Sequence, residues 1–222
     1  MSDTKLDIAS DNLAPFKILN LKKDNLHEIV EICSNALLQN KIIVYPTDTL
    51  YGLGANAISV KAVKKIYTIK KRSEKKLLSI MTTKERIIEI CELSDDEYDI
   101  ITKFLPNPFT LLIKPKKLRF LNRYIAEDRI GVRVPDNSFC NELSKHIPYI
   151  TSTSANISGR LPVYKFEDLD FEIMNACDYV VNGGNCYYAA PSTIIDVVNK
   201  IIVRPGAGLN IAEQLIEELH KL

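Results

Sequence analysis

Short apolar runs alternate with amphipathic segments along most of this 222-residue chain, and this alternation limits its fold more than any other feature. The run 42–45 (Ile-Ile-Val-Tyr) ends at Pro46 and is followed, from Ser59, by apolar residues at helical spacing. The same reasoning predicts strands over 16–21, 42–45, 77–81, 109–113, 131–134, 149–152, 179–181, 192–198 and 201–204. It predicts helices from Asp24 and Ser59, short helices at the capping boxes Thr82–Glu85 and Ser94–Glu97, and a C-terminal helix from about residue 210.

Strands that alternate with helices in this way predict an α/β fold, with a twisted mixed sheet flanked by helices. The last two strands enclose Asn199-Lys200, which is typical of a hairpin turn. No Pro-, Gly- or Ser-rich linker divides the chain, so we expect a single domain over residues 16–222. Residues 1–15 are polar and mildly acidic, and we expect a flexible leader there.

Composition and charge exclude several classes of protein. The formal net charge of +1 argues against a protein that coats nucleic acid, which would be strongly basic. No apolar run approaches the ~18 residues that span a bilayer, and no signal peptide is visible, so we expect a cytoplasmic protein with no membrane partner. The five cysteines form no C-x-x-C pair, which argues against zinc ligands and disulfides. Four of them lie beside apolar residues in periodic segments, which predicts buried free thiols.

One segment is strongly basic although the whole chain is nearly neutral. Residues 61–76 contain eight Lys or Arg residues and one acidic residue, Glu74. A solvated helix surface accounts for such a run as well as an anion site does. Residues 70–76, which we expect to lie between a helix and the strand 77–81, favour the anion site, because cations on a connection at a sheet edge can hold a polyanion.

Polar and small residues gather just after or within several predicted strands. They occupy residues 45–54, 70–72, 152–159, and 191–196 together with 204–206. Ligands of open α/β sheets bind beyond the carboxyl ends of the strands, so we expect these segments to converge on one cleft. One such segment alone is accounted for by turn chemistry, whereas four in the same context favour a binding site.

Several common catalytic patterns are missing from the sequence. There is no G-x-x-x-x-G-K-[ST] and no G-x-G-x-x-G, and Gly52-Leu-Gly54 matches only half of the latter. The three histidines lie at predicted polar helix positions, so neither a Ser-His-Asp triad nor a His-rich metal site is expected. A bound phosphate must therefore be held by Lys, Arg, hydroxyl groups and backbone amides.

Together these motifs resemble the YrdC family, the threonylcarbamoyl-AMP synthases. The opening P-T-[ED]-T-x-Y-G-L-G matches Pro46 to Gly54, K-x-R matches Lys70-Lys-Arg72, and S-x-N matches Ser154-Ala-Asn156. The segments G-V-R-V-P, P-S-T-I-I-D and R-P-G follow at Gly131, Pro191 and Arg204. The resemblance covers about residues 20 to 210, with the motifs in order, and it implies the YrdC-like fold in a short single-domain form.

The resemblance implies a reaction and its partners. L-Threonine, bicarbonate or CO2, and ATP give L-threonylcarbamoyladenylate and pyrophosphate. Mg²⁺ is expected with ATP, held mainly by phosphate oxygens and water, with no side-chain ligand assigned; Asp48 is the nearest carboxylate. A transfer complex then carries the threonylcarbamoyl group to tRNA.

The same resemblance implies roles for individual residues. Lys70 and Arg72 are the implied catalytic pair that binds the triphosphate, and the other implied nucleotide contacts are Lys76, Ser154, Asn156 and Arg204. The implied threonine pocket consists of Thr49, Arg133, Ser152 and Ser192, with Arg133 holding the carboxylate through two parallel hydrogen bonds. Apart from any resemblance, Arg133 lies between Val132 and Val134 in a predicted strand, so its charge needs a ligand or an ionic partner.

Several of these residues also fit roles that involve no ligand. Arg204 could pair with a surface acid, and Thr47 and Thr49 could supply turn hydroxyls. Asn107 stands where the family often has glycine, although asparagine tolerates a positive φ better than most residues, and Lys76 stands where many members have asparagine. The chain as a whole is also consistent with an RNA-binding module, although exposed aromatic residues are not interleaved with its basic ones, or with a paralogue of the same fold that lacks synthase activity.

Overall fold

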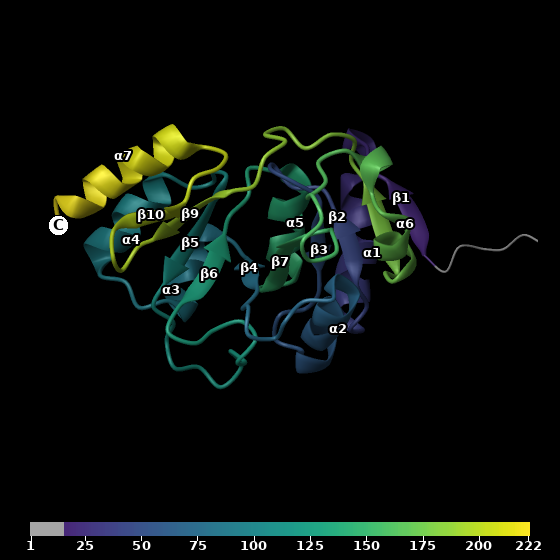
Figure 1. Ribbon diagram of the computed structural model, residues 1–222, viewed down its shortest axis with the longest axis horizontal. Helices are drawn as coiled ribbons and strands as arrows, with labels where there is room; N and C mark the ends of the chain where they lie inside the picture. Colours follow the sequence, from purple (N-terminus) through teal and green to yellow (C-terminus); the bar gives the residue numbers. More distant parts are fainter. Residues whose placement is uncertain (1–15) are drawn as a thin grey trace, which may run out of the picture.

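The structure is a computed structural model that describes residues 16–222, so the leader expected over 1–15 lies outside the described residues. One mixed sheet runs through the described chain in the order β1-β8-β2-β3-β7-β4-β6-β5-β9-β10 (Figure 1). The strands are β1 (Lys17–Asn20), β2 (Ile43–Tyr45), β3 (Gly52–Gly54), β4 (Ser79–Met81), β5 (Phe109–Ile113), β6 (Ile130–Arg133), β7 (Ile150–Ser154), β8 (Tyr179–Asn182), β9 (Thr193–Asp196) and β10 (Ile201–Arg204). The predicted α/β fold with a mixed sheet flanked by helices is confirmed.

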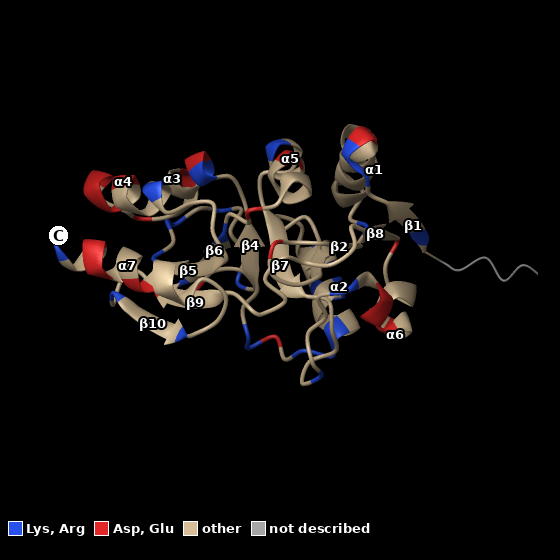
Figure 2. Cartoon of the chain, turned by 90° about the horizontal axis from the view of Figure 1, so that it is seen from above, with Lys and Arg blue, Asp and Glu red and all other residues tan. Residues whose placement is uncertain are grey.

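Helices cover both faces of this sheet. One face carries α1 (Leu26–Leu38), α3 (Ile87–Ile90), α4 (Asp95–Lys103) and α5 (Ser138–His146), which form a row in Figure 2. The other face carries α2 (Val60–Lys70) and α6 (Phe171–Asn175) at the end near β1. Helix α7 (Leu209–His220) packs against α4, β9 and β10 at the opposite end.

Local sequence signals account for most of the element boundaries. The Ser59 side chain accepts a hydrogen bond from the Ala62 amide at the start of α2, and Ser94 and Glu97 form the predicted capping box of α4. The box predicted at Thr82 is wrong, because the Thr82 hydroxyl donates to the Pro148 carbonyl instead. Strand β3 was not predicted, since Gly-Leu-Gly carries no strand pattern of its own and is held by its neighbours β2 and β7.

Two apolar clusters fill the space between the sheet and its helices. Helix α1 packs Ile29, Cys33 and Leu37 against β2 and α5, and the larger cluster joins the remaining helices to the sheet. All five cysteines are free and buried, whereas burial was predicted for four of them. Burial raises the pKa of each thiol, so the thiols remain protonated at neutral pH. Within residues 16–222, no helix is long and apolar enough to cross a membrane.

The departure at Asn107 is accommodated without a left-handed backbone. Asn107 does not adopt a positive φ, so the tolerance of asparagine for that region is not what preserves the loop. Its side-chain amide instead donates to the Phe104 carbonyl at 2.7 Å, and its backbone carbonyl accepts from the Phe109 amide at 2.7 Å. The loop before β5 is therefore fixed by the asparagine itself.

Gly206 offers a direct test of packing next to β9. A Cβ atom at this position would lie 2.3 Å from the Pro191 carbonyl oxygen, whereas one at Gly184 would meet nothing within 4 Å. Gly184 has a φ of +72°, so Gly184→Ala should cost only about 1 kcal/mol of conformational strain. Gly206→Ala should lower the free energy of unfolding by more, about 3 kcal/mol, because the backbone of the neighbouring segment at Pro191 must move. Urea denaturation measures both free energies of unfolding, and equal losses would contradict this packing.

Candidate functional site

A cavity of about 400 Å³ lies over the middle of the sheet, and it gathers most of the predicted site residues. Among residues 16–222, its lining includes three arginines and several hydroxyl groups but no acidic residue. The predicted residues that it brings together are Thr49, Arg72, Arg133, Ser152, Ser154, Asn156, Ser192 and Arg204. The four polar segments therefore do converge on one site.

The cavity lies on the face of the sheet rather than at the ends of its strands. Residues two apart in one strand, such as Ser152 and Ser154 of β7 or Thr110 and Leu112 of β5, line it together. Side chains two apart point to the same face of a strand, so these residues form part of the floor. The expectation of a cleft beyond the carboxyl ends is wrong. The sheet is mixed, and the alternation of side chains along each strand places these lining residues on its face.

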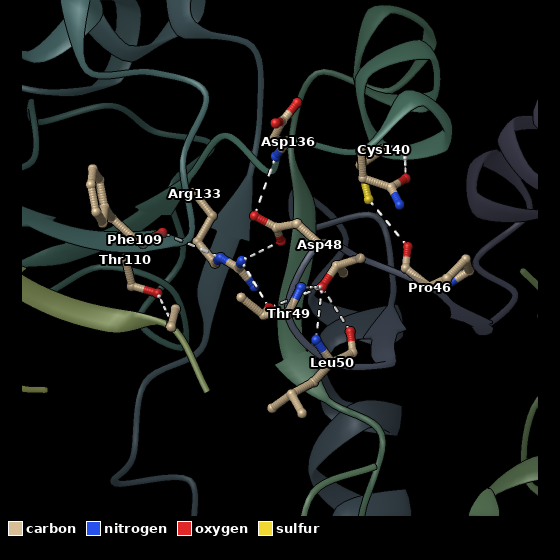
Figure 3. A network of polar contacts seen from close by, with 12 residues as sticks. Pro46, Asp48, Thr49, Leu50, Phe109, Thr110, Arg133, Asp136 and Cys140 are labelled. Atoms are coloured by element: carbon tan, nitrogen blue, oxygen red, sulfur yellow. Dashed lines mark hydrogen bonds and ion pairs between the residues drawn. The ribbon is translucent and has the colours of Figure 1, made fainter. Parts of the chain in front are cut away.

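A buried ion pair joins the loop after β2 to strand β6. Arg133 Nη2 lies 2.8 Å from Asp48 Oδ1, and both side chains are at most 9% exposed (Figure 3). The other Asp48 oxygen accepts from the Asp136 amide at 3.3 Å. The charge of Arg133 therefore has a protein partner, and Asp48 is the functional residue that the sequence reasoning left aside. The signal was present, since a cation predicted between two valines needs a carboxylate.

The remaining hydrogen bonds of Arg133 determine what it can offer a ligand. Its Nη2 also donates to Thr49 Oγ1 at 3.0 Å, and its Nε donates to the Phe109 carbonyl at 3.3 Å. Nη1 has no protein partner among the described residues. The guanidinium therefore faces the cavity through Nη1, and the expected side-by-side pair of bonds through Nη1 and Nη2 is not available in this arrangement.

The two threonines of the loop both line the cavity, but their hydroxyl groups have different partners. Thr47 Oγ1 accepts from the Thr49 and Leu50 amides at 3.1 and 3.2 Å and donates to the Leu50 carbonyl at 2.7 Å. It therefore holds the turn. Thr49 Oγ1 instead lies between Thr47 Oγ1 and Arg133 Nη2, at 3.0 Å from each.

Arg72 and Arg204 are cations without a carboxylate partner among residues 16–222. Arg72 donates to the carbonyls of Lys76 and Leu77 at 3.1 and 3.0 Å, and Arg204 donates to the Ser192 carbonyl at 2.7 Å. Burial lowers the pKa of both guanidinium groups, and repulsion from Arg133 lowers that of Arg204 further. Carbonyl oxygens orient these side chains but do not neutralise them, so the cavity keeps two uncompensated positive charges.

Thr110 is a second residue that the sequence reasoning missed. Its hydroxyl lies 2.8 Å from the Ser192 hydroxyl, and both residues line the cavity and are buried. The pair joins β5 to the residue before β9, close to Arg204. Its only signal in the sequence was the polar residue in the otherwise apolar strand 109–113.

Two of the predicted phosphate ligands are placed differently from the rest. Lys70 ends α2 with its side chain buried, and its ammonium donates to the carbonyls of Ser154 and Asn156 and to Asn156 Oδ1. Burial, with repulsion from Arg72, lowers the pKa of Lys70 to about 7, while the three acceptors favour its charged form. Lys76 is exposed, and its side chain does not line the cavity; only its carbonyl takes part, accepting from Arg72.

The other cations of the basic segment are exposed. Lys71 pairs with Glu172 at 2.6 Å, Lys65 donates to the Asn40 carbonyl, and Lys64 lies over the ring of Tyr124. Within residues 16–222, no group of three or more His, Cys, Asp or Glu side chains gathers as a metal site.

Removal of one partner of the Asp48–Arg133 pair should have a large effect on stability. Asp48→Asn leaves a buried guanidinium without its counter-charge, which should lower the free energy of unfolding by about 3 kcal/mol. Glu92→Gln is the matched control, because Glu92 pairs with Lys114 at the surface and should change it by less than about 0.5 kcal/mol. Chemical denaturation of both variants measures the difference, and similar losses would show that the buried pair contributes no more than a surface pair.

Several known proteins are similar to this chain over most of its length. A protein of Methanocaldococcus jannaschii named "Putative threonylcarbamoyl-AMP synthase" is 39% identical over 194 residues, covering 87% of this chain and 92% of the relative. A threonylcarbamoyl-AMP synthase of Vibrio parahaemolyticus is 29% identical, covering 82% of this chain and all of the relative.

Solved structures show the same fold. The chain matches Pyrococcus abyssi Sua5 in complex with L-threonine with a TM-score of 0.80 and 25% identity, over 91% of this chain but only 61% of that one. Escherichia coli YciO matches with a TM-score of 0.75 and 20% identity, over 88% and 98% of the two chains. The family model of the Sua5, YciO and YrdC proteins, described as telomere recombination, matches residues 35–206. The chain therefore belongs to the Sua5/YciO/YrdC family.

Proposed function

We propose that this protein is an L-threonylcarbamoyladenylate synthase, which converts L-threonine, bicarbonate or CO2, and ATP into the adenylate and pyrophosphate. The observation that carries the proposal is the pair of uncompensated arginines, Arg72 and Arg204, in a cavity without acidic residues. Such a cavity suits a polyanion with several phosphate oxygens. The curated relatives named as threonylcarbamoyl-AMP synthases and the family membership support the same reaction.

The chemistry needs alignment and positive charge more than covalent help. The amine of threonine adds to CO2 and loses a proton, which gives a carbamate. A carbamate oxygen then attacks the α-phosphorus of ATP, the new P–O bond forms, and the bond to the β-phosphate oxygen breaks to release pyrophosphate. Arg72, the catalytic residue of the proposal, stabilises negative charge on the phosphate oxygens of ATP. Arg204, at the end of β10, binds the same triphosphate.

The remaining lining residues of the cavity suit the amino-acid substrate. Arg133 offers Nη1 to the carboxylate of threonine, while Asp48 holds its opposite edge. Thr49, Ser152 and Ser192 supply hydroxyl groups around it. Thr110 belongs to this group through its bond to Ser192. The Pyrococcus abyssi Sua5 structure, which holds L-threonine, supports an amino-acid pocket in this fold.

Mg²⁺ belongs to this proposal as the metal of the nucleotide. No carboxylate from the described part of the chain lines the cavity, and Asp48 is already engaged by Arg133 and the Asp136 amide. The residues present therefore fit a Mg²⁺ ion that is coordinated by phosphate oxygens and water. The adenylate would be passed in the cytoplasm to a transfer complex that modifies tRNA.

The reaction is tested by measuring pyrophosphate release from Mg-ATP by the purified protein. Release should require both L-threonine and bicarbonate, because the nucleophile forms only from the two together. A protein that binds ATP but releases no threonine-dependent pyrophosphate would be a paralogue without synthase activity. Salt-sensitive tRNA binding that ATP does not displace, without pyrophosphate release, would favour the RNA-binding alternative.

Arg72 provides the sharpest substitution. Arg72→Gln removes an uncompensated charge from the cavity, so kcat/KM for ATP should fall by at least tenfold, since a charge-assisted contact contributes about 1.5–3 kcal/mol. Arg123→Gln is the control, because Arg123 is exposed and lies near Glu74, and it should change kcat/KM by less than about twofold. Equal effects of the two variants on kcat/KM would remove Arg72 from the proposed phosphate site.

A further inference from the structure

Lys70 is a buried lysine without a carboxylate partner among the described residues. Its side chain is 2% exposed, and it takes part in none of the ion pairs of residues 16–222. Its ammonium instead meets the Ser154 carbonyl, the Asn156 carbonyl at 2.8 Å and Asn156 Oδ1 at 3.3 Å. A lysine ammonium has three N–H donors, so these three acceptors use all of them. No donor is left for a phosphate oxygen.

The backbone of Lys70 holds the same loop from a second point. Its carbonyl accepts from the Ser158 amide at 2.8 Å, two residues beyond Asn156. The cavity is lined by Ser154 and Asn156 but not by Lys70. Lys70 therefore lies behind the Ser154–Asn156 loop and acts on the cavity through it.

The ammonium also determines which way the Asn156 amide points. A lysine ammonium can only donate, so the amide atom that faces it must be the oxygen. The Asn156 Nδ2 atom then donates to the carbonyls of Arg160 and Ile157, at 2.7 and 3.1 Å. This consistent arrangement uses both N–H donors of the amide inside the loop.

The orientation of Asn156 in turn fixes the hydroxyl group of Ser154. Ser154 Oγ lies against Asn156 Oδ1, and because that atom is an acceptor, the hydroxyl must donate to it. The one hydroxyl hydrogen of Ser154 is therefore used, and its oxygen keeps free lone pairs. The half-buried Ser154 side chain lines the cavity, so it presents an acceptor there.

We propose that Lys70 is a positioning residue that fixes the hydrogen-bond polarity of Ser154 and Asn156, so that Ser154 accepts a hydrogen bond from a ribose hydroxyl group of the nucleotide. Phosphate oxygens at neutral pH are acceptors and find no free donor on the side chains of this loop. They find donors on Arg72 and Arg204 instead. A ribose hydroxyl group is a donor and matches the Ser154 oxygen. This inference rests on the proposed nucleotide substrate.

The test compares the binding of ATP, 2′-deoxy-ATP, 3′-deoxy-ATP and inorganic tripolyphosphate by calorimetry, which needs no catalytic turnover. The wild-type protein should bind one of the two deoxy nucleotides roughly three- to tenfold more weakly than ATP, which corresponds to one hydrogen bond. Ser154→Ala removes only the hydroxyl group, so it should abolish this difference and leave the Kd of tripolyphosphate within about twofold. Lys70→Met should also abolish the difference, and Lys70→Met combined with Ser154→Ala should not change the ratio further.

Lys71→Met is the matched control, since Lys71 is exposed and pairs with Glu172. It should keep the wild-type ratio of Kd values. The proposal is overturned if the wild-type protein does not discriminate against either deoxy nucleotide, or if Ser154→Ala keeps the discrimination. It is also overturned if Lys70→Met weakens ATP, both deoxy nucleotides and tripolyphosphate by one common factor, because that pattern identifies a direct phosphate ligand. Absence of pyrophosphate release would contradict the proposed reaction but would leave these binding ratios measurable.

Discussion

The ion pair between Asp48 and Arg133 is the constraint on which the rest of the cavity depends. Asp48 follows β2 and Arg133 belongs to β6, and β3, β7 and β4 lie between these two strands in the sheet. The pair therefore ties the loop after β2 across the centre of the sheet. A buried pair of this kind contributes less to net stability than to specifying one arrangement, because the desolvation of two charges offsets much of their attraction. Here that arrangement orients Thr49 and turns Arg133 Nη1 into the cavity.

The three arginines of the cavity differ in how their charge is balanced. Arg133 is neutralised by Asp48, whereas Arg72 and Arg204 are held only by backbone carbonyls. A dipole orients a guanidinium without cancelling its charge, so two positive charges remain for a ligand. Arg72 and Arg204 therefore suit the several charges of a phosphate chain, whereas Arg133, already paired, suits a single carboxylate. The Ser154–Asn156 loop, held from behind by Lys70, lines the same cavity with the Ser154 oxygen as an acceptor.

The sequence predicted the elements and the convergence of the motifs better than the direction of individual side chains. Apolar periodicity located most strands, and local capping located α2 and α4, because these signals are encoded within a few residues. Strand β3 was missed, because its pairing depends on β2 and β7, which are distant in the sequence or carry the pattern themselves. The cavity was expected at the strand ends and lies on the face of the sheet. The burial of Lys70 was not predicted, because it arises from β7 and the loop after it, more than 80 residues away. The need of Arg133 for an ionic partner was visible in the sequence, but Asp48 could not be identified as that partner because it lies 85 residues away.

A cavity that joins an amino acid, one inorganic carbon and a nucleotide should give a single product that carries all three. Mass spectrometry of the product formed from ATP, L-threonine and ¹³C-bicarbonate identifies it. We expect an adenylate that contains threonine and one ¹³C atom, formed in equal amount to pyrophosphate, and greatly reduced in Arg72→Gln. Pyrophosphate release without ¹³C in the adenylate, or an adenylate of threonine itself, would contradict this expectation.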